Sequence, residues 1–407
     1  MRVLVALDDR QLQVGNNFYS HNLTYESFWC RYLDVFDSVL IIARVIRADS
    51  VPEGWGVVNR EGISVEALSQ YHGPFQYIEK MPIIRRVIRN ALRPDDACIL
   101  RISGNIGTQV WKQLQSGRPF GVEVMSDPWL IFAPGNIRHI GRPFYRWLWT
   151  RNQKLQCSQA AAVSYNTKHT LQQRYPANKY AFTTYYSDVE LDVTDLCTDT
   201  TRRLEAISSI PKRLASNGDP VRLGFVGSFS QIHKLPHIHI KALAQCVAKR
   251  ANLTLDMIGD GELLQEMKTL AKNLNVGRRV TFHGRIPAGQ QVMAAMDTFD
   301  LFLNVTAAEG LPRVVIEAMA RGCPCLASDT GGTPELIEPD YLVPSHDVNA
   351  LANKILTVLK NPAAMVKAVK RNIGVARNYC KDVLQPRRRA FYQALRERTE
   401  KHLSERF

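Results

Sequence analysis

Residues 300–329 constrain the fold of this chain most strongly, because strand-like and helix-like patterns alternate there within a short length of sequence. Apolar runs typical of buried strands occupy 301–305 and 324–328. Between them, Pro312 suits the first position of a helix, where its missing N–H is not needed, and Gly322 suits the position after a helix. The segment therefore predicts strand, loop, helix and strand, the repeating unit of a parallel α/β sheet.

Two carboxylates lie on the loop and the helix of this unit. Glu309 is on the loop, and Glu317 is about one and a half turns inside the helix. In a parallel sheet such a helix N-terminus lies at the carboxyl ends of the strands, where its free N–H groups and its dipole favour phosphate. Both carboxylates can then face one polar ligand beside a phosphate site. Alternatively, Glu317 pairs with Arg321 one turn later, and Glu309 is an ordinary loop residue.

The whole run resembles a known signature. Glu309 and Glu317, followed by Gly322-Cys323-Pro324 and by the glycine-containing run 329–335, resemble the signature of retaining glycosyltransferases of family 4, which have the GT-B fold. The resemblance implies an α/β protein with two Rossmann-like domains facing across a central cleft. It also implies that Glu309 hydrogen-bonds the donor sugar, as a catalytic residue, and that Glu317 hydrogen-bonds the nucleotide ribose.

The start of the second domain carries further donor contacts that the resemblance implies. In the family, an arginine beside a glycine and a lysine several residues later bind the donor diphosphate. Here Ser228 follows Gly227 in place of the arginine, and Lys234 is retained, so Lys234 is assigned to donor binding and to catalysis. Ser228 can donate a hydrogen bond but supplies no charge, and His233 or Arg313 could compensate. The remaining predicted donor-site residues are Gly259, Gly284, Arg285, Gly310, Leu311 and Pro312.

Asp127 is the predicted catalytic carboxylate of the first domain. Many family members end the corresponding strand with a histidine just before an acid, and here Ser126 stands in the histidine position. Glu123 and Asp127 are the available carboxylates, and Asp127 is preferred because it lies at the strand end. A role as a helix cap or turn residue before Pro128 is the open alternative.

The first domain is expected to be an open parallel sheet with helices on both faces. Strand-like runs at 3–7, 38–43 and 97–102 alternate with stretches of helix length. Gly15 and Asn16 after the first run, and Gly104 after the third, are predicted to border the acceptor side of the cleft, where glycine permits close backbone approach. An ordinary turn explains Gly15 almost as well.

The domain limits follow from shifts in composition together with the resemblance. Residues 1–190 are predicted to form the acceptor-binding domain, 191–219 a polar linker region, and 220–379 the nucleotide-sugar domain. The GT-B resemblance implies that the helical tail, 380–407, crosses back to the first domain. A free polybasic tail that contacts membrane is the competing interpretation.

A formal net charge of +14 limits the partners of the chain. Nucleic acid is not expected, because no helix-turn-helix, zinc-finger or RNA-binding signature is present. Anionic lipid, anionic glycan and nucleotide phosphate remain. The stretch 138–154 mixes basic and aromatic residues and could lie at a membrane interface or form the rim of an acceptor site, although a half-buried helix explains it equally well. Its basic residues are Arg138, Arg142, Arg146, Arg151 and Lys154.

Cysteine spacing and hydropathy bear on compartment and cofactors. The eight cysteines are scattered without paired metal or redox spacing, which indicates a reducing cytosol and no structural zinc. The first apolar run is too short for a signal peptide, and no stretch is long enough to cross a bilayer. We expect a cytoplasmic protein, with peripheral contact to the inner face of a membrane as a further expectation. A metal is not expected, because backbone N–H groups and a lysine can neutralise phosphate.

These features lead to a functional prediction that rests on the resemblance. The expected reaction moves a sugar from a nucleoside diphosphate to a hydroxyl of a glycan or lipid-linked acceptor, in polysaccharide or glycoconjugate biosynthesis. UDP-hexose is the first choice of donor on family frequency. The main alternative is a catalytically degenerate nucleotide-sugar-binding protein, because Ser126 and Ser228 replace charged or basic family residues. An epimerase or an inverting transferase of the same fold is also open, and a nucleic-acid-binding protein is the least supported.

Overall fold

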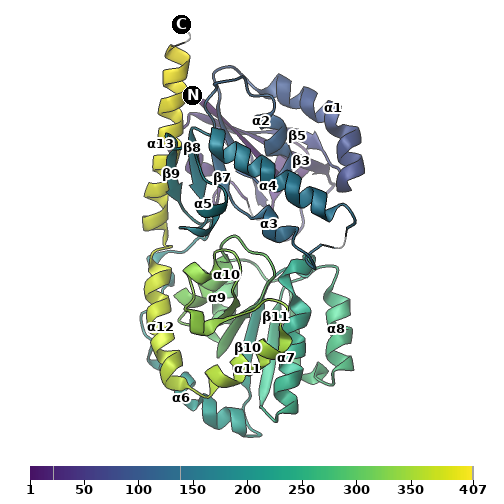
Figure 1. Ribbon diagram of the computed structural model, residues 1–407, viewed down its shortest axis with the longest axis vertical. Helices are drawn as coiled ribbons and strands as arrows, with labels where there is room; N and C mark the ends of the chain where they lie inside the picture. Colours follow the sequence, from purple (N-terminus) through teal and green to yellow (C-terminus); the bar gives the residue numbers. More distant parts are fainter. Residues whose placement is uncertain (22, 138, 406–407) are drawn as a thin grey trace.

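Two α/β domains, one above the other in Figure 1, make up the computed structural model, which describes residues 1–21, 23–137 and 139–405. Each domain is built on a sheet whose strands lie between layers of helices. Because both faces are covered, strands such as 3–6 are almost completely buried and read as continuous apolar runs. The predicted architecture of two Rossmann-like domains is confirmed.

The second domain has a six-stranded sheet in the order β12-β11-β10-β13-β14-β15, with every neighbouring pair parallel. This is the doubly wound order, in which ligands bind beyond the carboxyl ends of the strands, at the switch point between β10 and β13. The strands are β10 (Val221–Val226), β11 (Leu253–Ile258), β12 (Val280–Gly284), β13 (Leu301–Asn304), β14 (Cys325–Ser328) and β15 (Leu342–Val343). The helices are α6 (Thr201–Ala215), α7 (Pro236–Ala248), α8 (Leu264–Asn273), α9 (Gln290–Asp297), α10 (Arg313–Ala320), α11 (Val348–Leu359) and α12 (Pro362–Arg377).

The first domain repeats this order in its parallel strands, β5-β3-β1-β6-β7-β8-β9, with a switch point between β1 and β6. The strands are β1 (Arg2–Val14), β2 (Asn17–Ser20), β3 (Ser38–Arg47), β4 (Gly56–Val57), β5 (Ile63–Ser69), β6 (Ala97–Ile102), β7 (Gly121–Val124), β8 (Ala162–Tyr165) and β9 (Phe182–Tyr185). The helices are α1 (Gly73–Ala91), α2 (Asn105–Trp111), α3 (Pro128–Ile131), α4 (Arg142–Gln159) and α5 (Thr170–Arg174).

The first strand is longer than its apolar run predicts. Its register against β3 shifts between Ala6 and Arg10, and its last residues then pair with β2 in an antiparallel hairpin. Gly15, with a φ of 59°, and Asn16 form the exposed turn of that hairpin. The prediction that these two residues form a ligand loop on the cleft is therefore wrong. A glycine–asparagine pair between strand-like runs is itself a hairpin signal.

The region predicted as a linker contains a helix of the second domain. Helix α6 packs against α12 and β10, and its Ile207, Ile210 and Leu214 are buried. The polar composition of 191–219 reflects the exposed face of this amphipathic helix, so the linker prediction is wrong for that part of the range.

The last helix, α13 (Lys381–Ser404), runs from the second domain along the first (Figure 1). It packs on β8 and β9, with Phe391, Tyr392 and Leu395 buried. The ring of Tyr392 stacks on that of Tyr32 at a centroid distance of 4.6 Å. A Cβ on Gly121 would lie 2.9 Å from the Phe391 ring, so this glycine permits the close approach of helix and sheet. The described part of the tail is therefore a packed helix rather than a free polybasic segment.

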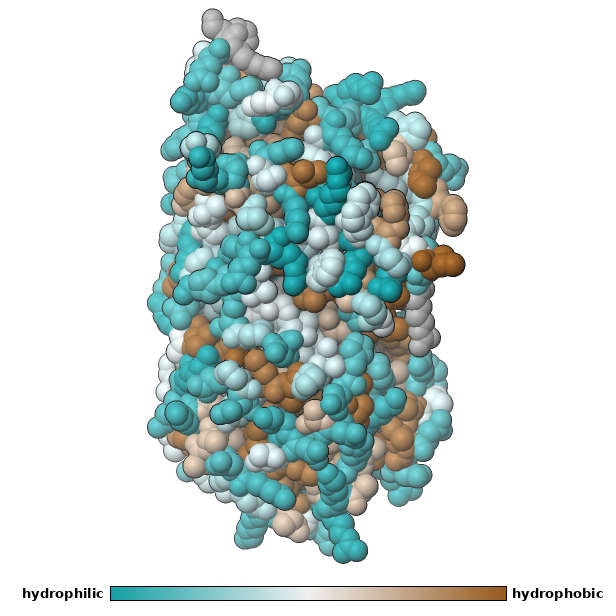
Figure 2. Space-filling model, in the orientation of Figure 1, coloured by the Kyte–Doolittle hydropathy of each residue, from teal (hydrophilic) through white to brown (hydrophobic). Residues whose placement is uncertain are grey.

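Polar side chains cover most of the face shown in Figure 2. On the first domain, apolar side chains gather at one edge, over α1 and over the segment that leads into α4. No helix among the described residues is long and apolar enough to span a membrane.

Candidate active site

An ion pair joins the two loops that flank the switch point of the second sheet. Lys234 follows β10, and its Nζ lies 2.6 Å from Oε1 of Glu309, which follows β13. Both side chains are mostly buried, with 22% and 10% of their surfaces exposed. The structure thus brings two residues predicted for the donor site into direct contact. A lysine and a carboxylate at this edge of a parallel sheet form a polar centre that suits a charged ligand.

A buried histidine connects the same two loops. His239 in α7 accepts a hydrogen bond from the N–H of Val305 through Nε2, at 3.2 Å. Its Nδ1 lies 3.2 Å from the carbonyl of Leu235, so the ring is the neutral tautomer with its proton on Nδ1. Burial lowers the pKa of His239 to about 3. The N–H of Ala307 also donates to the carbonyl of His233 at 2.7 Å, which adds a second link between the loops.

The backbone around the ion pair takes conformations that constrain the sequence. Leu235, with a φ of 49°, is in the left-handed region, which is rarely adopted by leucine and recurs at functional sites. Gly331, with a φ of 58°, packs so closely on the carbonyl of Glu309 that a side chain would collide with it. The N–H of Gly332 donates to the carbonyl of Gly310 at 2.7 Å. These contacts explain two glycines of the run 329–335.

Glu317 is not paired with Arg321. The Arg321 guanidinium binds Asp297 instead, through Nε at 2.8 Å and Nη2 at 2.7 Å. The Glu317 carboxylate makes no hydrogen bond or ion pair with any other residue that the structure describes. Burial raises the pKa of Glu317, and the nearby charge of Arg313 opposes that rise. A partly buried carboxylate without a partner is typical of a ligand-binding acid.

A cavity of about 310 Å³ lies between the domains, which we call the cleft cavity. Glu309 and Arg313 line it from the second domain, and Asp9 and Asn166 from the first. Asn166 Oδ1 is buried and lacks a hydrogen-bond partner among the described residues. Burial raises the pKa of Asp9, whose carboxylate also accepts from the Ser20 hydroxyl at 3.1 Å. The cleft cavity thus carries Glu309 from the second domain and two acids from the first, Asp9 and the arginine-paired Asp188.

Asp9 is a site residue that the sequence analysis missed. It is the second of two acids that follow the first buried run, and acids at the carboxyl end of a parallel strand are candidates for the ligand edge of the sheet. The sequence predicted a strand only over 3–7, whereas β1 continues past Asp9 to Val14 with a shifted register against β3.

The prediction that Asp127 is catalytic is wrong. Its side chain is buried and caps α3 by accepting from the N–H of Trp129 at 3.0 Å. Its oxygens also accept from the Tyr175 hydroxyl, at 2.5 Å, and from the Arg174 guanidinium. Asp127 does not line the cleft cavity. The alternative role as a helix cap describes it correctly, because the acid directly precedes a proline-initiated helix.

The neighbouring polar residues of the first domain are also engaged. Glu123 is fully buried and pairs with Arg101 at 2.6 Å, and it accepts from the hydroxyls of Tyr186 and Tyr32 at 2.6 and 3.2 Å. Ser126, which stands in the family's histidine position, hydrogen-bonds the Ser103 hydroxyl at 2.8 Å rather than facing the cleft cavity. The neighbouring Met125 does line that cavity.

The other predicted donor residues lie at the carboxyl ends of β10, β11 and β12. Gly259 approaches the carbonyl of Gly227 so closely that a side chain would collide, and its N–H donates to the carbonyl of Gly284 at 2.8 Å. Ser228 Oγ accepts from the N–H of Ser230 at 3.1 Å and so caps its own turn. Arg285 is exposed beyond β12. In the loop after β13, Gly310 and Leu311 line the cleft cavity, and Pro312 precedes the first residue of α10.

A carboxylate from the second domain caps a helix of the first. Glu335 accepts from the backbone N–H groups of Lys168, His169 and Thr170, at 2.6, 3.0 and 2.7 Å. The hydroxyl of Thr170 donates to the same carboxylate at 2.7 Å. This cap at the start of α5 links the two domains beside the cleft cavity.

Two predictions concern other parts of the first domain. Gly104, expected at the cleft, lines a separate cavity between helices and approaches the Asp8 carboxylate too closely for a side chain. The basic and aromatic stretch 138–154 forms α4 from Arg142 onward, and Arg138 lies outside the described residues.

Among the residues that the structure describes, no cluster of His, Cys, Asp or Glu is arranged to hold a metal ion.

The sequence is similar to several known proteins. Residues 207–374 match the family model described as glycosyl transferases group 1. The chain is 26% identical to Protein CapJ of Staphylococcus aureus over 365 residues, which cover 87% of this chain and 85% of that protein. It is also 30% identical over 154 residues to WcaL of Escherichia coli strain K12, described as a putative colanic acid biosynthesis glycosyltransferase. That match covers 36% of this chain and 37% of WcaL.

Solved structures share the fold over almost the whole chain. Sucrose-phosphate synthase from Thermosynechococcus elongatus superposes with a TM-score of 0.67 at 16% identity, covering 97% of this chain and 98% of that one. Anabaena Alr3699/HepE, solved in complex with UDP and glucose, superposes with a TM-score of 0.59 at 18% identity. That match covers 98% of this chain and 99% of the neighbour. The two-domain arrangement is therefore that of the GT-B fold.

Proposed function

We propose that this chain, a glycosyltransferase of group 1 with the GT-B fold, moves a hexose from UDP to an acceptor hydroxyl and retains the configuration of the anomeric carbon. The observation that carries the proposal is the Lys234–Glu309 pair at the switch point of the second sheet, with the partly buried, unpartnered Glu317 in α10, the helix that follows the Glu309 loop. Together they supply one cation for a diphosphate and two carboxylates for sugar hydroxyls.

The ion pair suggests how donor binding rearranges the site. A diphosphate carries more negative charge than a carboxylate, so it would replace Glu309 as the partner of Lys234. Glu309 is then free to accept hydrogen bonds from the hydroxyls of the donor sugar. Glu317 faces the ribose hydroxyls, whose donated hydrogen bonds would favour its charged form and offset the burial that raises its pKa.

Charge development explains the catalytic part of the proposal. As the bond between sugar and diphosphate breaks, positive charge grows on the sugar and negative charge on the leaving group. Lys234 and the N-terminal N–H groups of α10 stabilise the leaving diphosphate without a metal ion. Losing one such preorganised donor typically raises the barrier by about 3–4 kcal/mol.

Donor, pathway and location are proposed on the basis of the relatives. A UDP donor is favoured because the structural neighbour HepE was solved with UDP. A role in polysaccharide assembly is favoured by the name of WcaL, and a lipid-linked or glycan acceptor fits such a role. We place the protein in the cytoplasm, at the inner face of a membrane, because of its basic charge.

Thermal shift with UDP, GDP, ADP and their common sugar conjugates tests the donor site. A ligand at about 100 times its Kd adds about 2.7 kcal/mol to the stability of the folded state, which is readily measured. We expect a shift with uridine nucleotides that is lost in Glu317→Ala. No shift with any nucleotide would contradict the proposal.

Variants of the two glutamates separate binding from transfer. Glu317→Ala is expected to weaken nucleotide binding, whereas Glu309→Ala should retain nucleotide binding and reduce transfer by about 100-fold or more. Donor binding without any turnover in the wild type would instead favour a degenerate nucleotide-sugar-binding protein. That alternative draws support from Ser228, whose hydroxyl is engaged in its own turn. Equal and negligible effects of both substitutions would refute the site assignment.

A further inference from the structure

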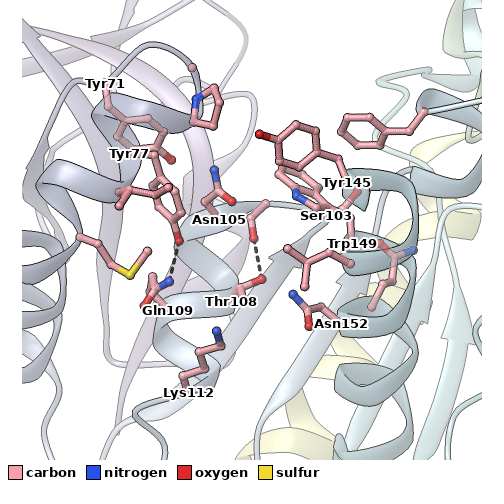
Figure 3. A pocket seen from close by; sticks show the side chains of 18 of the residues that line it. Tyr71, Tyr77, Ser103, Asn105, Thr108, Gln109, Lys112, Tyr145, Trp149 and Asn152 are labelled. Atoms are coloured by element: carbon pink, nitrogen blue, oxygen red, sulfur yellow. Dashed lines mark hydrogen bonds between the residues drawn. The ribbon is translucent and has the colours of Figure 1, made fainter. Parts of the chain in front are cut away.

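A second cavity, of about 500 Å³, lies inside the first domain between α1, α2 and α4. Figure 3 shows Tyr71 and Tyr77 on one side and Tyr145 and Trp149 on the other, with Asn105 and Thr108 between them. We call it the helix cavity. Its volume is in the range of small-molecule sites, and it lies over the switch point between β1 and β6, where sheets of this order bind ligands.

At two places, consecutive residues of the chain separate the helix cavity from the cleft cavity and form a wall between them. In β1, Asp9 lines the cleft cavity, and the next residue, Arg10, lines the helix cavity. After β7, Met125 lines the cleft cavity, and the next residue, Ser126, hydrogen-bonds Ser103, which lines the helix cavity. A molecule in the helix cavity that reaches this wall would therefore lie next to residues that line the cleft cavity.

A buried amide at this wall lines the helix cavity and has an unused acceptor. Gln153, which is 1% exposed, lines the cavity and donates from Nε2 to the carbonyl of Ser126 at 3.0 Å. Its Oε1 is buried and has no hydrogen-bond partner among the described residues. A buried acceptor without a partner costs free energy, and a ligand hydroxyl at this end would satisfy it.

The rest of the lining combines apolar surface with positive charge. Aromatic rings and aliphatic side chains such as Met81 and Leu148 form the walls between α1 and α4. Three cations, Arg10, Arg44 and Lys112, also line the cavity. Arg44 is held by the Asp8 carboxylate at 3.5 Å, whereas Arg10 and Lys112 are exposed. Such a lining suits a hydrocarbon chain that carries an anionic group.

The mouth of the helix cavity is apolar and its surroundings are basic. Phe75 and Ile78 of α1 and Phe144 of α4 are 85%, 62% and 57% exposed, and Ile78 and Phe144 line the cavity. Figure 2 shows apolar side chains over α1, the helix that carries Phe75 and Ile78. Helix α4 contains four basic residues and no acid. Large exposed apolar side chains on a basic surface are typical of a membrane-facing site rather than of a site for a soluble glycan.

We propose that the helix cavity binds the hydrocarbon chain and phosphate of a membrane lipid to which the acceptor sugar is attached. The chain lies between α1 and α4, the phosphate lies against Arg10 and Lys112, and the sugar reaches the wall at Gln153, beside the cleft cavity. The proposal rests on the transferase function above and narrows its acceptor to a phosphate-bearing lipid. Its test needs no donor, so the two proposals succeed or fail separately.

A chain-length series tests the hydrocarbon part without any variant. Ethyl, hexyl and decyl phosphate, each below its critical micelle concentration, are titrated into the full chain by calorimetry, with inorganic phosphate alongside. Each CH₂ buried should tighten binding about fourfold until the chain fills the cavity. An affinity that does not depend on chain length, or equal binding of inorganic phosphate, would overturn the proposal. Binding of maltopentaose without binding of any alkyl phosphate would assign the cavity to a glycan instead.

Two tryptophan substitutions on α1 locate the binding. Met81→Trp fills the helix cavity and should weaken decyl phosphate binding at least 10-fold. Ile83→Trp adds the same ring two residues away, at an exposed position that does not line the cavity, and should leave the affinity unchanged. Circular dichroism and melting temperature show whether each variant is folded. Equal affinities in both variants would place the binding elsewhere and refute the proposal.

The charge of the occupant is tested at two exposed cations. The double variant Arg10→Ala and Lys112→Ala should bind decyl phosphate several-fold more weakly and with a smaller dependence on salt. Binding of octyl glucoside, which has a chain but no charge, should not change in the same variant. On vesicles, the wild type should bind better when phosphatidylglycerol replaces part of the phosphatidylcholine. Equal binding to both vesicle types would refute the membrane source of the ligand.

Discussion

The two sheets have the same strand order, yet the acids near the carboxyl ends of their strands differ in how many partners they have. In the second domain, Glu309 faces the cleft cavity with a single lysine partner, and Glu317 has no partner among the described residues. In the first domain, Glu123, Asp127 and Asp188 are each paired with arginine. Acids at the same place in the fold thus have few partners in one domain and are held by arginine in the other.

The difference between the two sets of acids follows from the number of arginine side chains around each carboxylate. Arg101 lies between Glu123 and Asp188, at 2.6 Å from each, and all three side chains are nearly buried. Although burial raises the pKa of Asp188, the charges of Arg101, Arg31 and Arg388 hold it well below its usual range. A carboxylate with its hydrogen bonds satisfied by arginine has little capacity left for a ligand. Asp9, which has a hydroxyl partner and a raised pKa, is the exception in the first domain.

Removing Arg101, which pairs with both Glu123 and Asp188, should cause the largest loss of stability. Arg101→Met leaves Glu123 without its ion-pair partner and removes one of the arginine partners of Asp188, so the free energy of unfolding should fall by about 3–5 kcal/mol. Urea denaturation measures this change in the free energy of unfolding. The control is Arg222→Met in the second domain, where the arginine side chain is 41% exposed and lies 3.4 Å from Asp256. We expect a loss of less than about 1 kcal/mol there, and similar losses in both variants would refute the contrast between domains.

As the pH falls, the second domain should lose stability at a higher pH than the first. His239 has a pKa of about 3 in the folded chain and about 6.5 unfolded, so the stability from the neutral ring is complete above pH 6.5. That stability is lost as the pH falls from 6.5 toward 3, by about 2 kcal/mol at pH 5. The paired Asp188 stays ionised over this range because its pKa is lowered.

Denaturation of the wild type and of His239→Gln at pH 7.5 and pH 5 measures this contribution. The loss of stability on acidification should be about 2 kcal/mol smaller in the variant. His233, whose pKa is lowered to about 4 by burial and by Lys234, adds its own pH dependence to both proteins and cancels in the difference. The same acid dependence in both proteins would show that His239 does not carry it.

Removing the Glu335 cap that links the two domains should cause the smallest loss of stability. Glu335→Ala removes the cap from the start of α5, which should cost about 1 kcal/mol. It should also raise the radius of gyration in small-angle scattering, because one link between the domains is lost. The matched control is Glu338→Ala, three residues later, whose carboxylate lies 3.5 Å from Arg371 within the second domain. An identical radius of gyration in both variants would mean that the cap does not hold the domains together.

The sequence predicted the second domain better than the first. The loop and helix around Glu309 were recognisable because their signals, Pro312, Gly322 and the glycines of 329–335, lie close together in the chain. Asp127 was misassigned because its position at a strand end is the same for a catalytic acid and for a helix cap. Asp9 was missed because the bulge that brings it to the cleft follows from pairing between β1 and β3, which is not a local property.

By itself the sequence determined the alternation of strands and helices, the glycine turns and the two glutamates proposed for the donor site, since each depends on residues within a few positions of one another. Only the tertiary structure decided which acids are available to a ligand. Arg101 and Arg174 are 22 and 47 residues away from the carboxylates they neutralise. Electrostatic pairing depends on distance in space and on burial, and neither is fixed until the chain has folded.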